Sequence, residues 1–223
     1  MRIGAESRIP TVTLNLLIIN LIVWVAQSIL PRVGIDFTNL FGMHYFGAKS
    51  FGVWQMISYM FLHAPGLGHI FSNMFALFMF GPVLERIWGS KRFLIFYLVT
   101  GVGAGLVQQL VWFISTPPEV LMYYSDLLLT IGASGAIFGI LLAFGMIFPD
   151  IPLFILFVPV PIKAKWFVIF YGLFELFSGV ASLGGSNIAH FAHLGGMLFG
   201  FLMIKYWQKK DKKQSVNGWQ DFY

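Results

Sequence analysis

The sequence contains no cysteine and few charged residues, and each scarcity excludes a class of protein. Without cysteine among its 223 residues, the chain can form no disulfide, use no thiolate nucleophile and hold no metal through sulfur. Charged residues make up only 10% of the chain, well below their share in a soluble domain. Any covalent chemistry must therefore use oxygen or nitrogen, and most of the chain is expected in an apolar environment.

Apolar and aromatic residues take the place of charge. They account for 58% and 18% of the chain, and the mean hydropathy is +0.80. A spanning helix needs about 20 apolar residues. The sequence predicts an all-α, polytopic membrane bundle of six transmembrane helices, forming a single domain over residues 1–223. The predicted spans are residues 11–30, 67–88, 93–114, 127–148, 166–183 and 189–207.

Lysine and arginine are distributed unequally between the two sides of this bundle. With the N-terminus inside, only Arg32 and Lys49 of the 14 basic residues fall in outer segments. The positive-inside rule therefore predicts that both termini are cytoplasmic, with a basic cytoplasmic tail over residues 208–223. This topology accounts for the net charge of +5, so no nucleic-acid partner is expected.

Three connecting segments have distinctive compositions. Residues 31–66 combine aromatic residues and glycine with few charges, which predicts a segment lying in the membrane interface. Residues 151–160 are flanked and interrupted by prolines, which predicts an interfacial loop rather than a helix. The stretch "SLGGSN" at 182–187 is expected to form a mobile loop that admits water.

Polar side chains inside spans are costly in lipid, so each is a candidate for function. Spans two, four and six run in the same direction. His69 and Asn73 begin span two, Ser134 is expected about two turns into span four, and His193 lies near the start of span six. All four are therefore expected at similar depth below the outer surface, with His69 and Asn73 on one helical face.

Glycines in two of these spans are spaced for close helix packing. The stretch "TIGASGAIFG" carries Gly135 and Gly139, and "AHLGGMLFG" carries Gly196 and Gly200. Small residues four apart let two helix backbones approach closely. The short hydroxyl of Ser134 could then reach an imidazole on the neighbouring helix.

The chemistry expected of this group is nucleophilic catalysis. A serine hydroxyl attacks only when a base takes its proton, so Ser134 is the predicted nucleophile and His193 the predicted base. His69, Asn73 and the backbone N–H of Ser134 are the predicted donors to the oxyanion. Glu175 is the only carboxylate deep in a span, but its span runs the other way, so a Ser-His dyad is predicted rather than a triad.

These motifs resemble the rhomboid family of intramembrane serine proteases. The matches are "GASG" with Ser134, "AHLGGMLFG" with His193 and "HIFSN" with His69 and Asn73, in the family's order on spans four, six and two. The resemblance implies a rhomboid-like fold, with Ser134 and His193 catalytic and His69 and Asn73 stabilising the oxyanion. Three positions depart from the common pattern: Gln55 follows Trp54, Arg86 directly follows Glu85, and Phe138 replaces a tyrosine.

The resemblance further implies an endopeptidase that cleaves transmembrane segments near the outer face through an acyl-enzyme, without metal or cofactor. Its partners are transmembrane substrates, entering sideways from the lipid bilayer and carrying small or helix-destabilising residues at the cut. The short basic tail and the lack of extra domains suit a bacterial inner membrane, and the oligomeric state is left open.

Two other functions fit parts of the sequence. Three imidazoles, from His69, His190 and His193, could hold zinc, although Ser134 and Asn73 would then have no role. A non-catalytic relative that only binds transmembrane helices would not need the serine and histidine pair.

The remaining histidines are assigned by their positions. His190 competes with His193 for the role of base, but the spacing of His193 to the following glycines fits better, so His190 is expected to be a loop or entry residue. His44 and His63 are expected to be polar loop residues. Glu175 is expected to be held by internal hydrogen bonds or to face a wet cavity.

Overall fold

The computed structural model describes residues 8–154, 161–181 and 190–218, without the side chains of 213–218. The protein is mostly helical (77%) with little strand, as predicted. Its long helices are α1 (Thr11–Ile29), α4 (Leu67–Trp88), α5 (Ser90–Ser115), α7 (Ser134–Ile147), α8 (Ala164–Ala181) and α9 (His190–Gly218). The short elements are η1 (Leu30–Val33), α2 (Phe37–Phe41), β1 (Met43–His44), α3 (Gln55–Ser58), η2 (Tyr59–Phe61), α6 (Pro118–Tyr123), η3 (Ser125–Leu127), β2 (Leu129–Thr130), β3 (Pro152–Leu153) and β4 (Ile162–Lys163).

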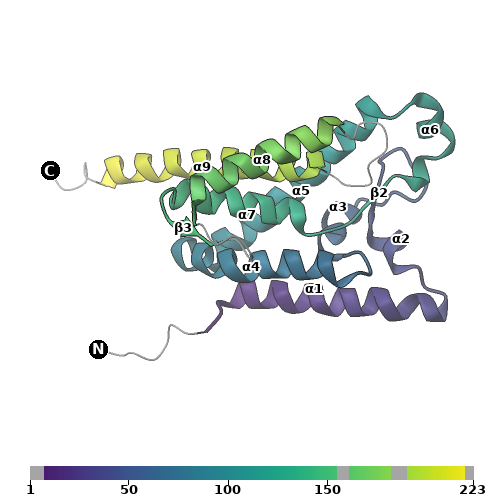
Figure 1. The fold of residues 1–223 in the computed structure, drawn as a ribbon, viewed down its shortest axis with the longest axis horizontal. Coiled ribbons are helices and arrows are strands. Elements are labelled where there is room, and N and C mark those ends of the chain that lie inside the picture. Colours follow the sequence, from purple (N-terminus) through teal and green to yellow (C-terminus); the bar gives the residue numbers. More distant parts are fainter. Residues whose placement is uncertain (1–7, 155–160, 182–189, 219–223) are drawn as a thin grey trace.

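The long helices lie side by side around a central group formed by α5, α7 and α9 (Figure 1). Helices α1 and α4 pack on one side of this group and α8 on the other. The start of α1 and the end of α9 lie at one end of the bundle, whereas α2, α3 and α6 lie at the opposite end. This arrangement is the one expected when both ends of the chain are on the same side of a membrane.

Each predicted span contains a helix, but only some are long and apolar enough to cross a membrane by length and composition. Among the described residues these are Thr11–Val33, Leu67–Trp88, Ser90–Ser115 and Ala164–Ala181. Helix α7 has 14 residues and is about 21 Å long at the α-helical rise, shorter than a hydrocarbon core of about 30 Å. The count of six spans therefore stays a prediction.

The predicted span 127–148 begins too early. Its first residues form the end of η3, strand β2 and the approach to the helix, so Ser134 is the first residue of α7 rather than two turns into it. Strand β2 pairs antiparallel with β1, with Met43 opposite Thr130. A short apolar run can form a strand or a helix, and hydropathy does not distinguish them.

The segment 31–66 folds onto the end of the bundle, and its position in the membrane interface stays a prediction. Its histidines are buried, and the two ring nitrogens of His44 lie 3.0 Å from the backbone oxygens of Asp126 and Asn39. The Gln55 amide accepts from the backbone N–H of His44 (3.2 Å) and donates to the Ser50 carbonyl (2.9 Å). These contacts hold the segment against β2, close to Ser134.

The other two connecting segments are described only in part. Around the proline-rich stretch, β3 and β4 form an antiparallel pair with Pro152 opposite Lys163. The predicted interfacial loop continues into residues 155–160, and the predicted mobile loop at 182–187 also lies outside the described residues.

The glycine contacts between α7 and α9 are present as predicted. A Cβ on Gly196 would overlap the backbone carbonyl of Gly135, and a Cβ on Gly200 would lie 3.4 Å from the Cα of Gly139. The two backbones therefore touch along two turns, which no larger residue at Gly196 would allow.

A buried carboxylate from α4 caps the first turn of α1. The N-terminal residue of that helix is preceded by Pro10, which supplies no side-chain cap. Glu85, 2% exposed, accepts from the backbone N–H groups of Val12 (3.0 Å) and Thr13 (2.7 Å), and also from the hydroxyls of Thr13 and Ser90. One carboxylate thus joins α1, α4 and the start of α5.

Replacing Glu85 with Gln should destabilise the fold, because a neutral amide accepts these four hydrogen bonds less well. Its NH₂ group would also face the N–H and O–H donors that now point at the carboxylate. We expect a loss of about 2 kcal/mol, measured by denaturation in detergent. Glu119→Gln, an exposed carboxylate on α6, is the matched control and should leave stability unchanged. Equal stability of the Glu85 and Glu119 variants would show that the cap contributes nothing.

The burial of His63 predicts an acid-sensitive contribution to stability. Burial, with the nearby His69 ring adding to it, lowers the pKa of His63 from 6.5 to about 4. The unfolded chain therefore binds the proton more readily, so this contribution is full above pH 6.5 and falls as the pH drops toward 4.

We expect His63→Leu to reduce the stability lost between about pH 7.5 and about pH 5 by about 2 kcal/mol relative to the parent protein. Denaturation in detergent at the two pH values measures the difference, and the parent protein supplies the contribution of all other groups. An identical pH dependence in both proteins would contradict the burial of a neutral ring.

Candidate active site

Ser134 lies where the chain turns from an extended segment into α7. Gly132, two residues earlier, has φ +133°, a conformation that favours glycine. Its N–H donates to the carbonyl of Tyr59 (2.9 Å), and the Tyr59 hydroxyl donates to the carbonyl of Gly101 (2.7 Å). The position of Ser134 is therefore set by the folded outer segment as well as by its own helix.

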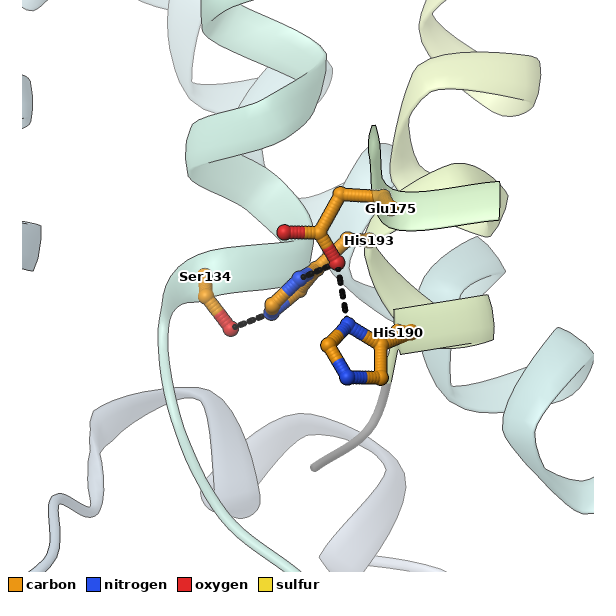
Figure 2. Close-up of polar contacts among 4 residues, drawn as sticks. All are labelled: Ser134, Glu175, His190 and His193. Atoms are coloured by element: carbon orange, nitrogen blue, oxygen red, sulfur yellow. Dashed lines mark hydrogen bonds and ion pairs between the residues drawn. The ribbon is translucent and has the colours of Figure 1, made fainter. Parts of the chain in front are cut away.

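His193 faces Ser134 from the first turn of α9. Its Nε2 lies 2.7 Å from the Ser134 Oγ, so the predicted contact between the two helices is present (Figure 2). Phe138, one turn after the serine, stacks on the imidazole with ring centroids 4.3 Å apart and planes at 6°. The phenylalanine ring thus covers one face of the imidazole.

Glu175 is held by internal hydrogen bonds, as expected, but its contact with His193 was not predicted. Its Oε2 lies 2.8 Å from the Nδ1 of His193 and 2.7 Å from the Nδ1 of His190 (Figure 2). Ser134, His193 and Glu175 therefore form a continuous chain of hydrogen bonds, although a dyad without a carboxylate was predicted. The depth argument failed because Glu175 lies only about 9 Å from the C-terminal end of α8, at the helical rise.

His190 is also not the loop or entry residue that was expected. It begins α9 and is buried, with its ring directed at Glu175. A signal for both residues was present in the sequence, since an ionisable group in an apolar span requires polar partners. His190 and His193 are three residues apart on one helical face, where a single carboxylate can reach both.

His69 and Asn73 lie on α4 and share a cavity with Ser134. The backbone N–H of Ala64 donates to the Nδ1 of His69 (3.1 Å), which leaves the ring proton on Nε2. That Nε2 lies beside Gly132, 3.0 Å from the position of a Cβ built there. Asn73 donates one amide proton to the His69 carbonyl (2.9 Å) and keeps a second proton available.

The cavity has a volume of about 960 Å³ and is lined by residues of α4, α7 and α8, Ser134 among them. Phe75 and Met79 of α4 line one wall, and Phe167 and Tyr171 of α8 line the other. Most of the lining is apolar, with the polar groups gathered around Ser134. The site therefore combines a small polar centre with walls suited to an apolar chain.

A metal could be held by a different group from the one predicted. Within the described residues, Glu175, His190 and His193 each offer one ligand atom, and these atoms lie within 4.8 Å of one another. His69 is not among them. The three groups are already hydrogen-bonded to each other, so a metal ion would have to displace the contact that joins His193 to Glu175.

The comparisons with known proteins identify the family. The Rhomboid domain matches residues 50–209. The chain is 32% identical to YdcA of Bacillus subtilis over 164 residues, which cover 72% of this chain and 70% of that protein. It is 30% identical over 207 residues to rhomboid-like protein 11, chloroplastic, of Arabidopsis thaliana, covering 85% and 62%. It is 31% identical over 174 residues to the rhomboid protease GluP of Bacillus subtilis, covering 74% and 29%.

The matched region spans less than two thirds of the Arabidopsis protein and of GluP. Proteins named as proteases and proteins named only as rhomboid-like both occur among these relatives. Together with the long apolar helices, the match makes this an integral membrane protein. The chain belongs to the rhomboid family.

Proposed function

We propose that the protein is an intramembrane serine endopeptidase that cleaves transmembrane segments of other membrane proteins. The observation that carries this proposal is the 2.7 Å contact between the Ser134 Oγ and the His193 Nε2 inside the cavity. Nucleophile and base lie within hydrogen-bond reach, as acyl transfer requires. The rhomboid protease names of relatives support the same function.

In the proposed reaction, the Ser134 Oγ attacks the carbonyl carbon of the scissile peptide while its proton passes to the His193 Nε2. The imidazolium then donates this proton to the departing amine as the carbon–nitrogen bond breaks, which leaves an acyl-enzyme. Water, deprotonated by His193, hydrolyses the ester and returns Ser134 to its starting state. The chemistry uses only groups that this chain carries.

The oxyanion formed in each step would be held by His69, Asn73 and the backbone N–H of Ser134. The Nε2 of His69 and the Oγ of Ser134 both lie near Gly132, 3.0 and 3.6 Å from the position of a Cβ built there, and Asn73 has an uncommitted amide proton. Donors already aimed at the developing charge are the largest contribution to many such reactions. The close approach at Gly132 leaves the imidazole room to reach the substrate oxygen.

The cavity walls indicate how a substrate would reach the site. Helices α4 and α8 flank the cavity with apolar and aromatic side chains, which suits a transmembrane segment entering sideways from lipid. We place the site on the outer half of the membrane, with six spans and both termini cytoplasmic, and we assign the protein to a bacterial inner membrane. An extended stretch of substrate with small residues would fit at Ser134.

Ser134→Ala and His193→Ala should each reduce cleavage of a model transmembrane substrate in liposomes by at least about 10³-fold, because nucleophile and base act as a unit. A fluorophosphonate probe should label the parent protein and neither variant. Ser115→Ala, which removes an exposed hydroxyl at the end of α5, is the control and should keep full activity.

Undiminished cleavage by Ser134→Ala would refute the assignment. Loss of activity on chelation, without any effect of the fluorophosphonate, would favour the metal-binding alternative. An absence of both labelling and cleavage in the folded parent protein would favour the non-catalytic alternative.

Asn73→Ala should lower kcat by about 10²-fold, because one donor to the oxyanion is lost. Asn20→Ala is a closely matched control, since each asparagine donates to the carbonyl four residues earlier in its own helix. Asn20 lies on α1, away from the cavity lining, and its variant should keep the parent kcat per folded molecule. Equal kcat values for the two variants would show that Asn73 does not stabilise the oxyanion.

A further inference from the structure

Glu175 is buried in a helix whose neighbouring side chains are exposed. It is 4% exposed, whereas Phe174 and Phe177 are 59% and 75% exposed. It is also the one acidic residue of α8. Burying a carboxylate at this depth is costly unless several donors hydrogen-bond to it. A buried Glu175 is therefore a candidate for a functional role, together with its partners.

The face of α8 that carries Glu175 packs against α9. Gly172 and Gly179 lie on the same face as Glu175, three residues before it and four after it. A Cβ on Gly179 would lie 3.3 Å from the Cβ of His190, and one on Gly172 would lie 3.1 Å from the Cε of Met197. The two glycines therefore allow the helices to approach, and Glu175 reaches the histidines between them.

One oxygen of Glu175 receives both imidazoles. The Nδ1 atoms of His190 and His193 lie 2.7 and 2.8 Å from Oε2, and the two ring planes are 86° apart (Figure 2). The two N–H groups thus approach the carboxylate from different directions. His190 thereby fixes the position of the oxygen that His193 contacts.

The contact also determines which nitrogen of His193 carries the proton. A neutral imidazole has one N–H, and a carboxylate can only accept, so the proton lies on Nδ1. The lone pair is then on Nε2, 2.7 Å from the Ser134 hydroxyl. This is the tautomer that a general base for the serine requires.

We propose that Glu175 and His190 are positioning residues that extend the Ser134–His193 pair to a carboxylate-supported relay; this inference rests on the proposed function. When His193 takes the serine proton, it becomes an imidazolium with an N–H at both nitrogens. Glu175 stays ionised throughout and stabilises that charge, and it neither gains nor loses a proton. His190 keeps its Nδ1–H on the carboxylate and holds it in place.

The test compares Glu175→Gln and Glu175→Met by steady-state cleavage of a transmembrane substrate. Glutamine keeps an acceptor but loses the charge, and methionine loses both. We expect kcat to fall in both variants, by up to about 10⁴-fold, the size seen when an amide replaces the acid of a serine triad. KM should change little, because the substrate does not touch Glu175.

Two further variants separate positioning from folding. His190→Asn keeps a donor where the Nδ1 was and should retain more of the parent kcat than His190→Leu. Glu85→Gln removes a buried carboxylate that caps α1 and should keep the parent kcat per folded molecule. A purely structural role would instead lower the folded fraction of the Glu175 variants and leave their turnover per folded molecule unchanged.

The outcomes distinguish this inference from the proposed function. If Ser134→Ala is inactive while both Glu175 variants, folded, keep kcat within about threefold of the parent, the relay is wrong and the protease assignment stands. If Ser134→Ala is active, the protease assignment is wrong, and the relay that rests on it is wrong as well. If chelation of the parent protein abolishes activity and Zn²⁺ restores it, the cluster is a metal site, which overturns the relay.

Discussion

The structure depends on the contact between the backbones of α7 and α9. Serine has the shortest side chain that can act as a nucleophile, so it reaches a base on another helix only where the two backbones nearly touch. Gly196 provides that approach, since a Cβ there would overlap the facing carbonyl of Gly135. Ser134 directly precedes one of these glycines, and His193 lies one turn before the other. In lipid, where apolar surface gives helices little reason to associate, such packing between small residues is what holds two helices in register.

Two buried carboxylates show how the same bundle handles charge in different ways. Glu85 accepts from the first turn of α1 and from two hydroxyls, and these donors take no part in the proposed reaction. Glu175 accepts from two imidazoles, one of which contacts Ser134. Glu85 joins helices that are distant in the sequence, whereas Glu175 joins the consecutive helices α8 and α9. Both carboxylates would be costly if a partner were lost. Only the second one is coupled to a group whose charge changes during the proposed reaction.

The sequence predicted the helical class, the bounds of α4, and the meeting of Ser134 with His193, because hydropathy, glycine spacing and helix direction act at the level of whole helices. It did not predict the start of α7 or the partner of Glu175. The first depends on pairing between β1 and β2, which lie more than 80 residues apart. The second depends on which face α8 turns to α9, and a helix with large apolar residues on most sides gives no clear direction.

The short α7 helps to explain how the proposed hydrolysis would be compatible with a bilayer. Because the helix begins at Ser134, the residues before it are free to form β2 and the turn at Gly132, and the segment 31–66 packs over them. Ser134 therefore lies below the folded segment 31–66 instead of within a continuous apolar rod. Water can be held there by backbone groups and by His69 and Asn73, while the walls formed by α4 and α8 remain apolar. A helix extended to the length of a full span would fill that space with side chains and leave the serine in lipid.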